Sequence, residues 1–252
     1  MSAVEKVGSR GTAQSGDTVT DDFPIRVRRY GGLVRLNHWV TAVSLALLAI
    51  SGMALFTPKL FFLTALFGGG QMTRMIHPWI GLVLVVSFFL LFVRFWRANL
   101  PTIADGVWLK KIIDVVSNRD ETLPELGKYN AGQKFVFWSM SALIMVLVST
   151  GVVIWDQYFS GFVSIELQRF AVLIHASVAV FAICVWIIHV YAAFWVKGTF
   201  GAMTKGVVTG GWAWRHHRLW LKQLVEQREA KDVASALPAS ADPSIPHSRS
   251  QA

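Results

Sequence analysis

The chain has 252 residues, of which 54% are hydrophobic and 15% are charged, and its mean hydropathy is +0.47. This composition excludes an ordinary soluble domain and predicts an integral membrane protein. The formal net charge of +9 does not indicate nucleic-acid binding, because the basic residues flank the apolar segments, as in multi-pass membrane proteins. Cys184 is the only cysteine, so the sequence has no disulfide framework, and we expect this thiol to be a small buried apolar filler.

The N-terminal segment, residues 1–25, is rich in Ser, Thr, Gly and Asp and lacks the apolar stretch of a signal peptide. We expect a disordered cytoplasmic tail. A basic collar precedes the first expected span, residues 36–56, and consists of Arg26, Arg28, Arg29 and Arg35. Since Lys and Arg are enriched on the cytoplasmic side of spans, this collar predicts a cytoplasmic N-terminus and places His38 at the cytoplasmic end of the first span.

The second expected span covers residues 77–96. It begins at His77-Pro78, because proline is tolerated in the first turn of a helix. Arg97 follows its far end and indicates the cytoplasmic surface, so His77 is predicted on the external side. The preceding loop contains an apolar run, residues 60–67, which is too short to cross a bilayer and is expected to lie along the membrane interface.

A long basic connection leads to the third expected span, residues 135–155, and the fourth, residues 170–196, returns the chain to the cytoplasm. Residues 26–222 form one predicted domain that contains all four spans. Its last part is basic and tryptophan-rich, which suits a cytoplasmic headgroup surface, and we expect His216-His217 there to be an ordinary interfacial pair. Residues 223–252 are rich in Ala, Ser and Pro and predict a mostly disordered cytoplasmic tail.

The fourth span carries no formal charge but contains His175 and His189. At about 100° and 1.5 Å per residue, these histidines share one helical face about 21 Å apart along the axis, near opposite sides of the membrane. His189 therefore shares its depth with His38, and His175 shares its depth with His77. Two histidines at one depth on different helices supply the two axial nitrogens of a six-coordinate b-type haem, and such cofactors bind in bundle cores.

Other interpretations of these histidines compete with haem binding. They could form hydrogen bonds between helices, or they could bind zinc or another transition metal in a transporter. A metal site would need carboxylates or thiolates converging at one depth, whereas the four expected spans contain neither Asp nor Glu. Likewise, Gly52, Gly81 and Gly151 could make room for a haem or simply permit close contact between helices.

A weak internal repeat is present at an offset of 99 residues. Ser51-Gly52 aligns with Thr150-Gly151, and His77 aligns with His175 after a one-residue slip. Two similar helical hairpins in parallel orientation would produce this repeat, as would chance similarity between apolar segments.

A polar cluster lies immediately before the third span and includes Asn130, Gly132 and Gln133. It is expected at the cytoplasmic membrane edge, near the depth of His38 and His189. Its amide groups could hydrogen-bond a quinone carbonyl. The alternative is an Asn- and Gly-rich start of a helix with no ligand.

Together these motifs resemble the cytochrome b (gamma) subunit of membrane-bound respiratory formate dehydrogenase. The resemblance extends over residues 26–222 and is carried by residues 35–39, 71–78, 128–134, 137–138, 173–175 and 188–198. It implies an all-α, integral membrane four-helix bundle with both termini in the cytoplasm and two b-type haems. Their axial ligands would be His38 with His189 on the cytoplasmic side and His77 with His175 on the external side.

The resemblance also implies a site for menaquinone or ubiquinone beside the cytoplasmic haem, formed by Asn130, Gly132, Gln133 and His189. Expected partners are an iron–sulfur beta subunit and a molybdenum- or tungsten-containing alpha subunit. The chain itself is expected in the bacterial inner membrane, and the complex could form a higher oligomer. No residue is expected to be catalytic by itself, because the chain would conduct electrons to quinone. The alternatives are a cytochrome b subunit of a hydrogenase or thiosulfate reductase, and a haem-free membrane anchor.

Overall fold

The computed structural model describes residues 18–19, 25–117, 119 and 123–236. Nearly all of the tail expected over residues 1–25, and residues 237–252 of the C-terminal tail, lie outside these ranges. Residues 223–236, which were also expected in the C-terminal tail, instead continue the helix α10, Arg218–Ala236. Their Leu, Lys, Gln, Glu, Arg and Ala side chains are strong helix formers, which the overall polarity of the tail concealed.

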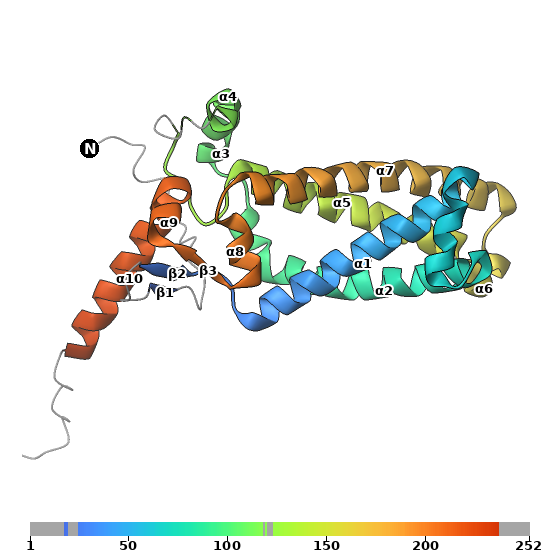
Figure 1. The fold of residues 1–252 in the computed structure, drawn as a ribbon, viewed down its shortest axis with the longest axis horizontal. Helices are drawn as coiled ribbons and strands as arrows, with labels where there is room; N and C mark the ends of the chain where they lie inside the picture. The colour runs from blue at the N-terminus through green and yellow to red at the C-terminus, as the bar shows by residue number, and fades with distance from the viewer. Residues whose placement is uncertain (1–17, 20–24, 118, 120–122, 237–252) are drawn as a thin grey trace, which may run out of the picture.

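Within the described residues, four helices are long and apolar enough to cross a membrane. Figure 1 shows these long helices lying along one another. They are α1, Gly32–Phe56; α2, Gly70–Phe95; α5, Ala131–Ile154; and α7, Ile165–Trp195. Large apolar side chains such as Phe89, Phe181 and Phe194 are exposed on their outer faces, where hydrocarbon is the natural solvent. The predicted all-α membrane bundle is thereby confirmed. Cys184 is exposed on α7, so the expectation of a buried filler was wrong.

The bundle consists of two antiparallel hairpins that start at the same end. In Figure 1, α1 packs along α2 and α5 packs along α7, and the hairpins meet through α1 with α7 and α2 with α5. Their shared core contains Leu45, Leu84, Met140 and Ile144. Two similar hairpins in parallel orientation are the arrangement that the internal repeat suggested.

The helix α2 begins seven residues before the expected span. Gly68 and Gly69 have positive φ angles of 86° and 98°, and they form the turn between α2 and the apolar 3-10 helix η1, Pro58–Phe67. Pro78 therefore lies inside α2 and not in its first turn. The missing N–H of this proline leaves one backbone carbonyl in the preceding turn without its helical donor.

One end of the bundle, called the sheet end here, carries a small antiparallel sheet (Figure 1). Its central strand β2, Arg26–Arg28, pairs with β1, Thr18–Val19, and with β3, Val207–Thr209. The short elements at this end are η2, Arg97–Asn99; α3, Ile103–Lys110; α4, Ile112–Val116; α8, Thr199–Thr204; and α9, Gly210–His216. The opposite end carries η1, α6, Asp156–Phe159, and η4, Ser160–Phe162. The sheet was not expected, because its strands come from distant parts of the chain.

Candidate functional site

The four histidines of the spans lie in the bundle as two pairs. His38 of α1 faces His189 of α7, with 6.3 Å between ring centroids. His77 of α2 faces His175 of α7, with 6.4 Å between ring centroids. The structure thus brings together the residues that were paired by depth, and α7 contributes one histidine to each pair.

Both histidines of the second pair are hydrogen-bonded to a hydroxyl on the first helix of their own hairpin. The Nδ1 atom of His77 lies 2.7 Å from Ser51 Oγ, and the Nδ1 atom of His175 lies 2.9 Å from Thr150 Oγ1. Each hydroxyl also donates to the backbone carbonyl four residues earlier, at 2.7 Å in both helices. When each hydroxyl gives its one proton to the carbonyl, its oxygen can only accept from the imidazole, and Nδ1 is then the donor. The Nε2 atoms of both rings then keep their lone pairs.

Glycines lie beside the same two rings. A Cβ atom on Gly52 would lie 3.5 Å from Cε1 of His77, and one on Gly151 would lie 3.5 Å from Cε1 of His175. The rings therefore pack directly against helix backbone, and a side chain larger than a methyl group would displace them. A Cβ atom on Gly81 would meet no other atom within 4 Å.

The first pair has different surroundings. Among the residues that the structure describes, the buried Nδ1 atom of His38 has no hydrogen-bond partner. Its ring packs edge-on to Trp39, whose Nε1 donates to the carbonyl of Met203 at 3.1 Å. A buried polar atom without a partner is unusual and points to a functional site.

The donor set fits a haem iron better than a bare metal ion. Within the described part of the chain, no group of three or more His, Cys, Asp or Glu side chains could hold a metal. Haem iron brings four nitrogens of its own and needs only two axial ligands. Two metal–nitrogen bonds of about 2.0 Å, with about 1.1 Å from each nitrogen to its ring centroid, place the centroids about 6 Å apart. Both pairs have this spacing.

The polar cluster at the start of α5 forms a capping box. The Oδ1 atom of Asn130 accepts from the backbone N–H of Gln133 at 2.9 Å, and Gln133 Oε1 accepts from the backbone N–H of Asn130 at 3.1 Å. A Cβ atom on Gly132 would lie 3.3 Å from the ring of Trp108. These contacts give the residues a structural role. Because the side-chain oxygens cap the helix, the amide NH2 groups of Asn130 and Gln133 are the groups that could donate to a ligand. Their role toward quinone stays a prediction.

A buried cationic cluster at the sheet end escaped the sequence analysis. Arg29, Lys128 and His217 are 2%, 1% and 1% exposed. The guanidinium of Arg29 donates to the carbonyl of Lys128, lies 3.4 Å from His217 Nε2, and packs 4.9 Å from the ring centroid of Trp220. The opposite ring nitrogen, His217 Nδ1, donates to the carbonyl of Gly127 at 2.7 Å.

The expectation that His217 is an ordinary interfacial residue was therefore wrong. Burial, and secondarily the charge of Arg29, lower the pKa of His217 well below its ordinary value. The neutral ring serves as donor and acceptor between segments that are far apart in sequence. The sequence signals for this cluster were the adjacent His216 and the nearby tryptophans. Neither signal predicted that Arg29 would contact His217.

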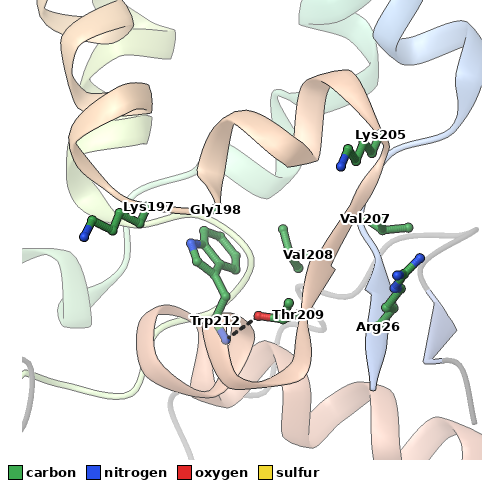
Figure 2. Close-up of a pocket in the computed structure, with 8 residues that line it drawn as sticks. All are labelled: Arg26, Lys197, Gly198, Lys205, Val207, Val208, Thr209 and Trp212. Atoms are coloured by element: carbon green, nitrogen blue, oxygen red, sulfur yellow. Dashed lines mark hydrogen bonds between the residues drawn. The ribbon is translucent and has the colours of Figure 1, made fainter. Parts of the chain in front are cut away.

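A basic pocket of about 250 Å³ opens between the end of α7 and β3. Figure 2 shows the indole of Trp212 beneath Gly198, with Arg26, Lys197 and Lys205 around the rim. None of the four paired histidines lines it, and neither does the start of α5. The pocket gathers basic residues of the expected headgroup surface and is separate from the histidine pairs.

Comparison with known proteins agrees with this architecture. Similar proteins include the cytochrome b556(Fdn) subunit of the nitrate-inducible formate dehydrogenase of Escherichia coli K12, 41% identical over 197 residues, or 78% of this chain and 90% of that protein. The cytochrome b556(fdo) subunit of formate dehydrogenase from the same strain is 40% identical over 203 residues, covering 81% and 95%. The formate dehydrogenase cytochrome b556 subunit of Haemophilus influenzae is 34% identical over 208 residues, covering 82% and 87%.

These similarities confirm the resemblance to formate dehydrogenase cytochrome b subunits. The sequence model of the prokaryotic cytochrome b561 family matches residues 29–206, which include the four long helices and all four paired histidines. The chain belongs to the prokaryotic cytochrome b561 family.

Proposed function

We propose that this chain is the membrane subunit of a respiratory formate dehydrogenase that carries electrons across the bacterial inner membrane to a quinone. The observation that carries the proposal is the two histidine pairs along α7, with ring centroids 6.3 Å and 6.4 Å apart. The relatives at 34% to 41% identity are named as cytochrome b556 subunits of formate dehydrogenase. Their names favour formate as the electron source over hydrogen or thiosulfate.

In this proposal His38 and His189 hold one b-type haem, and His77 and His175 hold the other. Bound haem b supplies one-electron chemistry at both levels of the bundle. Ser51 and Thr150 orient the imidazoles of the second pair, while Gly52 and Gly151 leave the space beside them. Apolar helix faces exclude water from both levels.

The sheet end is the cytoplasmic side in this proposal. It carries the basic collar and the basic segment after α7, whereas the basic residues of the opposite end are Lys59, Arg74 and Arg169, balanced in part by Asp156 and Glu166. Positive charge concentrates on the cytoplasmic side of membrane proteins. The opposite end would face an iron–sulfur beta subunit, which connects to an alpha subunit containing molybdenum or tungsten.

Quinone, either menaquinone or ubiquinone, would bind at the sheet end beside His189, near Asn130, Gly132 and Gln133. The start of α5 and the last turns of α7 lie at this same end of the bundle (Figure 1). The amide NH2 groups of Asn130 and Gln133 can donate to a quinone oxygen while their oxygens cap the helix. Protons for the quinol would come from the cytoplasm.

The test is a haem count combined with identification of the partners. Purified chain should contain two haem b groups in a pyridine haemochrome assay, and its dithionite-reduced spectrum should show a b-type α band. Purification without harsh detergent should retain an iron–sulfur subunit and a formate-oxidising subunit. A chain with no haem would be an anchor. Retention of a hydrogen-oxidising subunit would reassign the donor.

A further inference from the structure

We infer that Ser51 and Thr150 are positioning residues that tune the histidine pair at the opposite end, making it the site of lower reduction potential. This inference rests on the proposed binding of a haem between His77 and His175. The deciding observation is that the Nδ1 atom of each imidazole of this pair lies within hydrogen-bond distance of a helix hydroxyl, at 2.7 Å and 2.9 Å. A ring that binds iron through Nε2 carries its proton on Nδ1 and donates it to the hydroxyl, whose own proton has a backbone carbonyl within 2.7 Å.

The arrangement occurs once in each hairpin. Ser51 precedes Gly52, and Thr150 precedes Gly151, and in both cases the glycine leaves its histidine ring 3.5 Å from the position of a Cβ atom. Ser51 is 1% exposed, so water does not compete for its bond with His77. In each hairpin, the first helix thus places a hydroxyl and a glycine against the imidazole of the second helix. This repeated arrangement indicates that both rings must be held in a defined orientation.

The chemistry of an imidazole ligand gives the direction of the effect. Donation from Nδ1 raises the basicity of the ring and hence of its metal-bound nitrogen. A more basic ligand stabilises oxidised over reduced iron and lowers the reduction potential, and hydrogen bonding around the ligands is one of the protein's means of setting that potential. In the other pair, the buried Nδ1 of His38 has no such partner among the described residues.

The two pairs should therefore differ in potential, with the His77–His175 pair lower. Electrons that arrive at the opposite end would then move energetically downhill toward the sheet end. The difference is a property of this chain's own side chains, and it holds whichever partner delivers the electrons.

Equilibrium redox titration of the purified complex, followed at the α band, tests the inference. Wild-type protein should show two transitions. Ser51→Ala and Thr150→Val should each raise the lower transition, with a larger rise in the double variant, and leave the upper one in place. The controls Ser51→Thr and Thr150→Ser retain a hydroxyl and should keep the wild-type value. The variant His77→Met identifies the transition that belongs to this pair, because a methionine ligand raises the potential of its own haem.

The outcomes separate this inference from the proposed function. If wild-type protein has fewer than two haems, the proposed function fails and the inference fails with it. If the double variant keeps both haems and both wild-type midpoints, haem binding stands and the inference is overturned. A shift confined to the transition that His77→Met leaves unchanged would overturn it as well.

Discussion

The two histidine pairs have nearly equal ring spacings, 6.3 Å and 6.4 Å, but different origins in the sequence. The pair at the opposite end, His77 with His175, is supplied by equivalent positions of the two hairpins and keeps the hydroxyl and glycine that accompany each. At the sheet end, His38 and His189 have no such equivalents. At an offset of 99, Phe137 corresponds to His38, and with the one-residue slip Leu91 corresponds to His189.

The histidines of one pair thus occupy equivalent positions in both hairpins, whereas each histidine of the other pair is present in one hairpin only. Phe137 occupies its position by stacking on Phe92, with ring centroids 5.6 Å apart and planes at 7°. A second symmetric ligand there would require the loss of this stack. The repeated pair belongs to the common scaffold, whereas the unrepeated pair lies at the end that carries the sheet, the buried cations and the predicted quinone site.

The largest expected effect comes from removing one histidine of either pair. His175→Ala should abolish the haem at the opposite end and His189→Ala the one at the sheet end, because each leaves a single axial ligand. Haem content should fall to about one per chain in each variant, with the remaining α band differing between them. His216→Ala, outside the bundle, should retain both haems. Equal loss of both haems in either variant, from protein that still migrates as a folded monodisperse species, would contradict separate sites.

A change at Asn130 should affect only the sheet end. Asn130→Asp keeps a helix-capping oxygen but removes the amide donor, so haem content and formate-driven haem reduction should be unchanged. Haem reoxidation by quinone should slow by about tenfold, the effect of losing one transition-state hydrogen bond of about 1.4 kcal/mol. Stopped-flow absorbance at saturating quinone measures this rate. Asn130→Ala should show the same slowing together with a less stable α5 start. A wild-type rate in both variants would move the quinone site elsewhere.

Substitution of Arg29 should destabilise the sheet end without touching the His77–His175 pair. Arg29→Met removes the buried donor that contacts the carbonyl of Lys128 and Nε2 of His217, at a cost of about 2 kcal/mol. Thermal unfolding followed by tryptophan fluorescence should show a lower midpoint, whereas the α band of the opposite-end haem should be unchanged. The surface variant Arg228→Met serves as the control. An unchanged midpoint would show that the cluster contributes no net stability.

The expected effect that is smallest at neutral pH is a pH dependence of stability from His217. The pKa of this ring is lowered well below its ordinary value in the folded protein, so the unfolded chain binds a proton that the folded chain does not. Stability is therefore full above pH of about 6.5 and falls by about 1.4 kcal/mol per pH unit below it, until the folded pKa is reached. Melting curves between pH 7.5 and pH 5 should lose this dependence in His217→Gln and keep it in His216→Ala. Equal curves for all three proteins would assign the dependence to other groups.

Sequence reasoning was strongest for the bundle and for the pairing of the histidines. Hydropathy marks a span wherever about 20 apolar residues follow one another, and helical geometry then assigns a depth to every residue within it. His38, His77, His175 and His189 could be paired by depth alone for this reason. Helix boundaries were less certain, because α2 extends through Pro78 once Gly68 and Gly69 have formed the turn before it.

The sequence by itself determined the four membrane helices and the depth of each histidine along them, because these follow from local composition and helical periodicity. Only the tertiary structure decided that Ser51 and Thr150 bond His77 and His175, since that contact depends on how the helices of each hairpin pack. The pairing of β2 with β3 and the burial of Arg29 also arose there. Backbone pairing between distant segments leaves no periodic signal, and an arginine beside a membrane has the same sequence signature whether it faces lipid headgroups or an interior of aromatic rings.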